Sequence, residues 1–200
     1  HRVEDVATPQ AFRRDPELVL RFYDMRRKDV LAAQPNPAHA ALARLDAEWP
    51  GELLIVTQNI DDLHERAGAR RLLHMHGEAL SAWCLGCDAR HRWTGSLLDE
   101  PACPACGAGA LRPHIVWFGE MPYRMEEIFA ALARADVFVS IGTSGAVYPA
   151  AGFVQQAASH GARTLELNLE RSQSSRWFDE SRLGSASELV PKWVKEVLGG

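Results

Sequence analysis

Four cysteines in two C-x2-C pairs constrain this chain more than any other feature. Cys84 and Cys87 form the first pair, and Cys103 and Cys106 form the second after a gap of fifteen residues. Each pair suits a tight turn that aims two thiolates at one tetrahedral metal ion. We therefore expect a Zn2+ site with four protein ligands, and its role is structural because no coordination position remains for water.

Two disulfides or a thioredoxin-like redox motif are the alternatives for these cysteines. The other residues of the chain include no cysteine, and no leader of charged and then apolar residues is visible, so the sequence favours a reducing compartment and a cytoplasmic location. A redox motif needs one C-x-x-C that opens a helix, whereas two facing pairs occur here. Metal binding is the preferred interpretation.

Composition indicates a folded globular protein and argues against two kinds of partner. Apolar residues make up 46% of the chain and charged residues 24%, as in ordinary globular domains. The formal net charge of −4 supplies no positive field for a phosphate backbone. A nucleic-acid-binding zinc ribbon is disfavoured too, because Asp88, Asp99 and Glu100 offset Arg90 and Arg92. We expect no nucleic-acid partner and, since the apolar runs are only strand-sized, no membrane span.

Helix signals occur near the start of the chain. Thr8-Pro9, Asp15-Pro16 and Asn36-Pro37 each combine a capping residue with proline at the first helical position. They predict three helices, of which the second covers about Pro16 to Ala33 and the third runs through Ala38 to Leu45. Further helices are expected over Pro122 to Arg134, near Tyr148 to His160, and over Ser187 to Leu198.

Strands are expected between the later helices. The expected strands are Glu52 to Thr57, His114 to Phe118, Asp136 to Ile141 and Arg163 to Leu169. The first and third are apolar runs of the kind found in buried parallel strands. Alternating strands and helices predict an α/β fold with a parallel sheet covered on both faces, into which the zinc module of Glu78 to Arg112 is inserted.

Polar clusters follow three of these strands. They are Thr57 to Asp61, Gly142 to Ser144, and Asn168 to Glu170. Ligands of parallel sheets bind beyond the carboxyl ends of the strands, so the clusters predict a nucleotide-sized ligand. The turn from Gly142 to Gly145 offers backbone N–H groups to a phosphate, although a tight turn that closes a βα unit is the alternative.

The order and spacing of these motifs resemble the sirtuins, which are NAD-dependent protein lysine deacylases. The resemblance rests on Thr57 to His64, His76-Gly77, the four cysteines, Pro113 to Glu120, Gly142 to Ser144, and Asn168 to Glu170. It implies one catalytic core over residues 1–200. Within it, residues 37–77 and 113–200 would form a Rossmann-like domain for NAD, residues 1–36 the helical part of a small domain, and residues 78–112 its zinc-binding module.

The resemblance also implies which residues act on NAD. His76 would be the catalytic base, together with Asn59 and Asp61. His74 lies two residues earlier and would share a strand face with it, so spacing alone does not choose between them. The implied cofactor-binding residues are Gln58, Asn59, Ile60, Asp61, Gly142, Thr143, Ser144, Asn168, Glu170 and Ala186. Loop capping by the polar residues, and a structural hydrogen bond for the histidine, are the alternatives.

The substrate-binding residues implied by the resemblance are Val116, Trp117, Phe118 and Gly119. Their backbone would pair with an extended substrate peptide, and Val116 and Trp117 would line the acyl-lysine tunnel. An apolar strand that belongs to the core is the alternative.

Tyr23 and Arg26 suggest the acyl group. Residues three apart on a helix share a face, so a phenol and a guanidinium could hold one carboxylate together. The pair resembles that of class III sirtuins, which remove succinyl, malonyl and glutaryl groups. A buried Arg26 would favour an acidic acyl tip over acetyl. A solvated helix face is the alternative.

The resemblance also implies a first strand and a glycine-rich NAD loop that this sequence lacks. The chain starts at His1 without an initiator Met, so we expect that the true N-terminus is missing rather than naturally truncated. A mono-ADP-ribosyltransferase or a catalytically weak NAD-binding scaffold on the same fold is the alternative function. The expected partners are acyl-lysine proteins, and the expected oligomeric state is a monomer.

Overall fold

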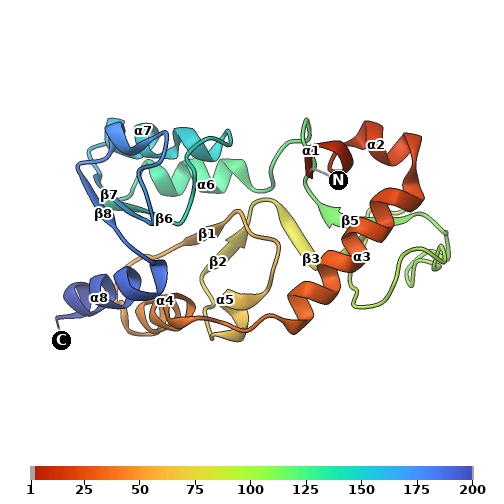
Figure 1. The fold of residues 1–200 in the computed structure, drawn as a ribbon, viewed down its shortest axis with the longest axis horizontal. Coiled ribbons are helices and arrows are strands. Elements are labelled where there is room, and N and C mark those ends of the chain that lie inside the picture. Colours follow the sequence, from red (N-terminus) through yellow and green to blue (C-terminus); the bar gives the residue numbers. More distant parts are fainter. Residues whose placement is uncertain (1–2, 200) are drawn as a thin grey trace. The chain divides into compact units, whose positions relative to one another are not determined.

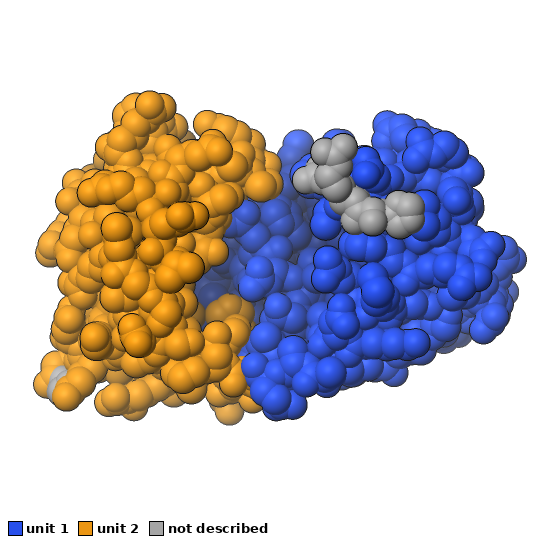
Figure 2. All heavy atoms as spheres, in the orientation of Figure 1, with its two compact units in different colours: residues 1–34, 55–63, 72–123 blue, residues 35–54, 64–71, 124–200 orange. Residues whose placement is uncertain are grey.

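The computed structural model describes residues 3–199, without the side chain of Glu4; the ends of the predicted domains at residues 1, 2 and 200 lie outside this part. The chain divides into two compact units, coloured separately in Figure 2. Unit 1 comprises residues 1–34, 55–63 and 72–123, and unit 2 comprises residues 35–54, 64–71 and 124–200. This division groups residues 55–63 and 72–77 with the zinc module, whereas the sequence interpretation places them with the NAD domain.

Unit 1 begins with three helices, and the predicted start signals are confirmed. The helices are α1 (Val3–Val6), α2 (Pro9–Arg14) and α3 (Pro16–Ala32). Thr8 accepts a hydrogen bond from the Ala11 N–H, and Asp15 accepts one from the Leu18 N–H, both at 3.0 Å. These side chains satisfy N–H groups that the first helical turn leaves without a partner.

Two sheets complete unit 1 (Figure 1). Strands β1 (Ile55–Thr57) and β2 (Leu72–His74) pair in parallel. Strand β3 (Gly77–Cys84) lies between β4 (Arg90–Arg92) and β5 (Leu111–Ile115), antiparallel to both. The expected strand from His114 to Phe118 is wrong, because β5 ends at Ile115 and the chain turns at residues 118–119. The cause is a side-chain clamp described below.

Unit 2 contains a parallel sheet of three described strands. The order is β6 (Val137–Ile141), β7 (Arg163–Asn168) and β8 (Glu180–Leu183). The predicted α/β class with parallel strands is confirmed. The expected burial of β6 is wrong. Val137 is 55% exposed, because β6 is an edge strand of this sheet. The central strand β7 is the buried one.

Helices of unit 2 cover the sheet and form its core. Helices α4 (Pro37–Glu48) and α8 (Ala186–Leu198) lie side by side and bury Leu45, Leu167, Val190 and Val194 (Figure 1). The other helices are α6 (Met125–Leu132), α7 (Phe153–Ser159) and the 3-10 helices η1 (Ala150–Gly152) and η2 (Ser175–Trp177). Helix α5 (Leu63–Arg66) crosses the division between the units. None of the described helices has the length and apolar character of a membrane span.

Two helices of unit 2 are shorter than predicted. The helix expected from Pro122 begins only at Met125, because Arg124 before it has the left-handed φ of 57°. The helix expected from Tyr148 is divided into η1 and α7. The predicted closing helix is confirmed as α8.

Candidate functional site

The four cysteine sulfurs lie close together on the turns of the zinc module. Sγ of Cys84 lies 3.7 Å from Sγ of Cys106, and Sγ of Cys87 lies 3.8 Å from Sγ of Cys103. All four sulfurs lie within 4.8 Å of one another. Sulfurs bound tetrahedrally at Zn–S distances of about 2.3 Å are about 3.8 Å apart, whereas a disulfide needs about 2.05 Å. The predicted zinc site is supported and the disulfides are excluded.

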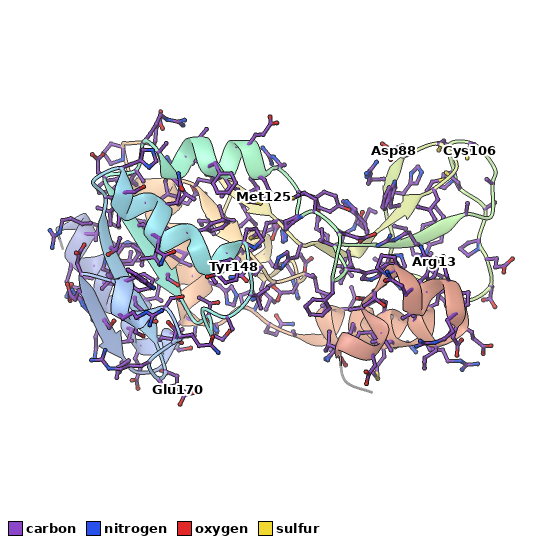
Figure 3. All side chains as sticks on the ribbon, turned by 90° about the horizontal axis from the view of Figure 1, so that it is seen from above. Arg13, Asp88, Cys106, Met125, Tyr148 and Glu170 are labelled. Carbon is purple, nitrogen blue, oxygen red and sulfur yellow. The ribbon has the colours of Figure 1, made fainter. Side chains whose placement is uncertain are left out.

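Backbone turns hold these thiols in place. The Asp88 N–H donates to the Cys84 carbonyl, and the Gly107 N–H donates to the Cys103 carbonyl. Asp88 and Cys106 lie on the loops at the far end of the β3–β4–β5 sheet (Figure 3). Nε2 of His91 lies 3.3 Å from Sγ of Cys103. A ring N–H at this position stabilises a thiolate, as groups around metal ligands commonly do.

His76 has the geometry of a general base. Its Nδ1 lies 3.1 Å from the Gln58 carbonyl oxygen. A carbonyl oxygen only accepts hydrogen bonds, so Nδ1 carries the proton and Nε2 carries the lone pair. Burial lowers the pKa of His76 and outweighs the opposing effect of the Gln58 carbonyl. The ring is therefore neutral at neutral pH.

Gly77 explains why a glycine follows the histidine. Its φ is 84°, and a Cβ at this position would lie 2.0 Å from the His114 carbonyl oxygen. No other residue type fits without moving the backbone of β5. The close approach also brings the Val116 N–H to the His76 carbonyl oxygen at 2.9 Å.

The loop after β1 brings most predicted residues of unit 1 together. The Asn59 N–H donates to the Thr57 hydroxyl at 3.1 Å, and Nδ1 of His74 lies 3.3 Å from the Asn59 carbonyl oxygen. His74 ends β2 and His76 lies in the following turn, so the two do not share a strand. The geometry thus separates two histidines that spacing leaves equivalent.

Asp61 caps its own loop, as the alternative interpretation of the polar residues holds. Its Oδ1 accepts a hydrogen bond from the Leu63 N–H at 3.1 Å. Ile60 is half-buried against the cluster that contains Tyr23 and Trp117. The Asn59 side chain is exposed. The loop is therefore anchored by Ile60 and by its own turn, and it presents Asn59 to solvent.

Unit 2 brings two of its predicted loops together. Nδ2 of Asn168 donates to the Thr143 carbonyl oxygen at 2.7 Å, which joins the loop after β7 to the loop after β6. Gly142 and Gly145 have φ values of 61° and 64°, which favour glycine. Ser144 lies between them, and its hydroxyl accepts from the Ala146 N–H.

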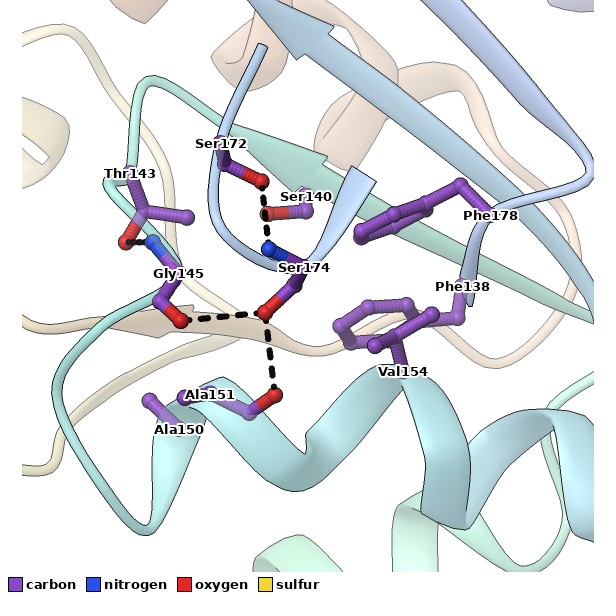
Figure 4. Close-up of a pocket in the computed structure, with 10 residues that line it drawn as sticks. All are labelled: Phe138, Ser140, Thr143, Gly145, Ala150, Ala151, Val154, Ser172, Ser174 and Phe178. Carbon is purple, nitrogen blue, oxygen red and sulfur yellow. Dashed lines mark hydrogen bonds between the residues drawn. The ribbon is translucent and has the colours of Figure 1, made fainter. Parts of the chain in front are cut away.

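A third segment, which the sequence interpretation missed, braces these loops (Figure 4). The Ser174 hydroxyl contacts the carbonyl oxygens of Gly145 and Ala151 at 3.0 and 3.3 Å, and the Gln173 N–H donates to the Ser144 carbonyl oxygen at 3.0 Å. The segment lines a cavity of about 20 Å³, enough for one water. Its sequence signal is only the serine-rich run at residues 172–175, which also fits an ordinary loop.

Glu170 and Ala186 lie near these loops without a direct bond to them. The Glu170 side chain is exposed at the surface of unit 2 (Figure 3). Ala186 is the first residue of α8 and lies two residues after Gly184, whose N–H donates to the Asn168 carbonyl oxygen at 2.9 Å. Ala186 is thus tied indirectly to Asn168.

The Tyr23 and Arg26 pair differs from its prediction. Tyr23 is buried, and burial raises its pKa to about 12, so its phenol is neutral. The Arg26 side chain is 46% exposed, and the expectation that it is buried is wrong. The buried arginine of this helix is Arg27, which pairs with Asp24 at 2.6 Å. One residue turns the helix face by about 100°, which carries Arg27 and not Arg26 inward.

The segment from Val116 to Gly119 is extended and then turns. Trp117 is 2% exposed and packs against Phe12, with ring centroids 5.2 Å apart. Phe118 is exposed, and its N–H donates to the Ala7 carbonyl oxygen at 2.9 Å. The Trp117 side chain thus contributes to the core, as the alternative interpretation holds.

Comparison with known proteins places the chain in a family. Residues 1–149 match the Sir2 family. The NAD-dependent protein deacylase of Yersinia pestis is 55% identical over 201 residues, which cover 99% of this chain and 72% of that protein. The NAD-dependent protein deacylase of Escherichia coli K12 is 54% identical over 203 residues, which cover 100% of this chain and 73% of that protein. The chain therefore belongs to the Sir2 family, the sirtuins.

Solved structures agree in fold. A Sir2 homologue in complex with NAD has a TM-score of 0.91 and 37% identity, and the match covers 98% of this chain and 78% of that one. A Sir2 structure bound to a myristoylated histone peptide has a TM-score of 0.80 and 34% identity, with 97% and 84% covered. The resemblance that the motifs indicate is confirmed.

Proposed function

We propose that this protein is an NAD-dependent protein lysine deacylase that prefers acyl groups with a terminal carboxylate, such as succinyl and malonyl, over acetyl. One observation carries the reaction class: in a Sir2-family chain, a neutral His76 is oriented by the Gln58 carbonyl beside the Asn59 and Asp61 loop. Relatives at about 55% identity carry the name NAD-dependent protein deacylase.

Each predicted residue receives a role in this proposal. When bound, NAD would supply the ribose carbon that forms a bond to the acyl oxygen as its bond to nicotinamide breaks. Nε2 of His76 accepts a proton from a ribose hydroxyl, which makes that oxygen a nucleophile. Gln58, Asn59, Ile60 and Asp61 hold the nicotinamide side without adding a positive charge that would compete with it.

The residues of unit 2 hold the rest of the dinucleotide in this proposal. The turn at Gly142, Thr143 and Ser144 suits a phosphate because its two glycines let the backbone approach a ligand closely, although the Gly142 N–H itself donates to the Leu167 carbonyl oxygen. Asn168 and Glu170 take the adenosine ribose hydroxyls, and Ala186 lies on the adenine side. Val116, Phe118 and Gly119 contact the substrate peptide. Zn2+ on Cys84, Cys87, Cys103 and Cys106 keeps the module folded.

Arg26 carries the proposed acyl preference. Its guanidinium lies 5.2 Å from the Phe22 ring centroid and 3.9 Å from the Asp29 carboxylate, which is too long for a tight ion pair. It therefore remains able to bind a carboxylate. The neutral Tyr23 phenol suits the second hydrogen bond, because a phenolate would repel the acyl carboxylate. An acetyl group has no terminal carboxylate, so it gives neither Arg26 nor Tyr23 a partner.

The experiment uses the full-length protein with matched succinyl-lysine and acetyl-lysine peptides, with and without NAD, and mass spectrometry reads the loss of the acyl group. We expect loss of the acyl group only with NAD, and faster from the succinyl peptide. Acetyl removed faster would overturn the acyl preference alone. ADP-ribose mass appearing on protein instead, or no reaction of either peptide, would overturn the deacylase assignment. The predicted domain boundaries, cytoplasmic location and monomeric state remain parts of the proposal.

A further inference from the structure

A buried ion pair lies directly beside the segment proposed to contact substrate. Arg112 on β5 is 4% exposed, and its guanidinium forms two bonds to the Glu120 carboxylate, at 2.7 and 3.0 Å. Burial tends to raise the pKa of Glu120. Hydrogen bonds from Arg112 and the Trp117 N–H outweigh this effect, so the pKa is lowered. The Glu120 carboxylate is therefore charged at neutral pH.

Within the described part of the chain, the side-chain hydrogen bonds of this pair all end on residues 113–120. Arg112 also donates to the Ile115 carbonyl oxygen at 2.8 Å and to its neighbour Pro113 at 3.4 Å. Oε2 of Glu120 accepts the Trp117 N–H at 2.9 Å. The guanidinium carbon lies 3.4 Å from the Trp117 ring centroid. The pair thus clamps residues 115–120 from both ends and across one face.

The energetics argue that this pair is more than a stabilising contact. Desolvation makes a buried ion pair weak evidence for stability, and an apolar replacement is often as stable. Its bidentate geometry does fix the backbone, which is a common use of such pairs. The clamp ends β5 at Ile115, because the Trp117 N–H is bonded to Glu120 instead of continuing a strand.

We propose that Arg112 and Glu120 are positioning residues that hold residues 115–119 in the shape that receives the acyl-lysine peptide, an inference that rests on the proposed deacylase function. The N–H groups of Val116, Trp117 and Phe118 are bonded to His76, Glu120 and Ala7 respectively. A substrate strand therefore pairs with the remaining groups of the segment, whose direction the clamp fixes. The Val116 bond ties the same segment to the backbone of His76.

Glu120→Gln tests the clamp, since glutamine keeps the size of the side chain and removes its charge. Hydrogen exchange of residues 115–120, measured by mass spectrometry, reads the clamp without any catalysis. We expect faster exchange there, with exchange in β7 unchanged. In kinetics, we expect KM for the acyl peptide to rise about five- to tenfold, while KM for NAD and kcat change less than about twofold.

Two further variants keep the test decisive. Arg112→Lys retains the charge but loses the bidentate fork, and it should raise KM for the peptide in the same direction. Asp46→Asn breaks the buried Asp46–Arg71 pair of unit 2, and it should lower the melting temperature without raising KM for the peptide. Equal effects on both KM values, or unchanged exchange at residues 115–120, would overturn the positioning role. Inactive wild-type protein would instead overturn the proposed function, and the exchange result would still stand.

Discussion

The two units hold their candidate site loops by different means. In unit 1, charge and metal ligation dominate, through the four thiols, the Arg112–Glu120 clamp and the Arg27–Asp24 pair. In unit 2, hydroxyls, amides and backbone groups join the loops at residues 142–145 and 168–175 to each other, and the Ser175 hydroxyl also donates to the buried Glu166 carboxylate of β7. Neutral groups around the turn at residues 142–145 suit a loop that is to receive a phosphate, because a carboxylate bonded to that turn would repel it. Substitutions in each unit test whether its loops are held in this way.

Metal removal should have the largest effect, and it should be confined to unit 1. Structural zinc contributes folding free energy directly, so Cys103→Ala or chelation should abolish zinc content and lower the melting temperature by on the order of 10 °C or more. Hydrogen exchange should lose protection in β3, β4 and β5 and keep it in β7. Retained protection of β3 after complete zinc loss would contradict the structural role.

Removal of the proposed base should have the next largest effect. His76→Ala should lower kcat by about 10²- to 10⁴-fold, because proton transfer is lost. Calorimetry should show that ADP-ribose still binds, because the contacts proposed for its phosphates and its adenosine do not include His76. His74→Ala is the matched control, with a much smaller loss of kcat. If His74→Ala costs as much as His76→Ala, the assignment of the base is wrong.

The pH profile sharpens the same point. Burial lowers the pKa of His76 below its ordinary value of about 6.5, and the base form is the neutral one. The acid limb of the activity profile should therefore lie below pH 6.5, and activity should be lost as the pH falls through the lowered pKa. A profile of kcat/KM with its acid limb at or above pH 6.5 would contradict this environment.

Loss of the Arg26 charge should act on one substrate only. Arg26→Met should lower kcat/KM for succinyl-lysine peptide by about tenfold or more and leave acetyl-lysine peptide within about twofold. Arg21→Met is the control, because Arg21 is also exposed on α3 and pairs with Glu17. Equal losses on both peptides would return Arg26 to the interpretation of a solvated helix face.

The smallest expected effect concerns the neutral brace of unit 2. Gly145→Ala brings a Cβ to 2.7 Å from the Ser174 hydroxyl, whereas a Cβ at Gly142 meets nothing within 4 Å. Both substitutions incur positive-φ strain of about 1 kcal/mol. Only Gly145→Ala should also displace Ser174, and its Kd for ADP-ribose should rise several-fold above that of Gly142→Ala. Equal Kd values would show that the brace does not shape the loop.

Local rules made much of this molecule predictable. The caps at Thr8 and Asp15 follow from the residues themselves, and the cysteine spacing follows from the coordination chemistry of zinc. The glycine after His76 belongs to a motif of the sequence, and the structure adds the reason for it, a close approach to β5. Such features depend on neighbours in sequence or on fixed geometry.

The errors arose where distant contacts decide. Nothing in the spacing shows that Arg112 reaches Glu120 and ends β5, or that Arg27 turns inward to the Ala79 and Gly95 carbonyls while Arg26 faces solvent. The edge position of β6 likewise depends on which strands pair with it. Tertiary packing overrides periodicity in these places.

The hydrogen bond from His76 to a main-chain carbonyl has a consequence for mutational tolerance. Every amino acid at position 58 supplies the same carbonyl oxygen, so the tautomer of His76 does not depend on the glutamine side chain. Histidines oriented by a carboxylate side chain lose that control through a single substitution. Here the path of the main chain sets the orientation of the His76 ring, and only a change in that path can alter it.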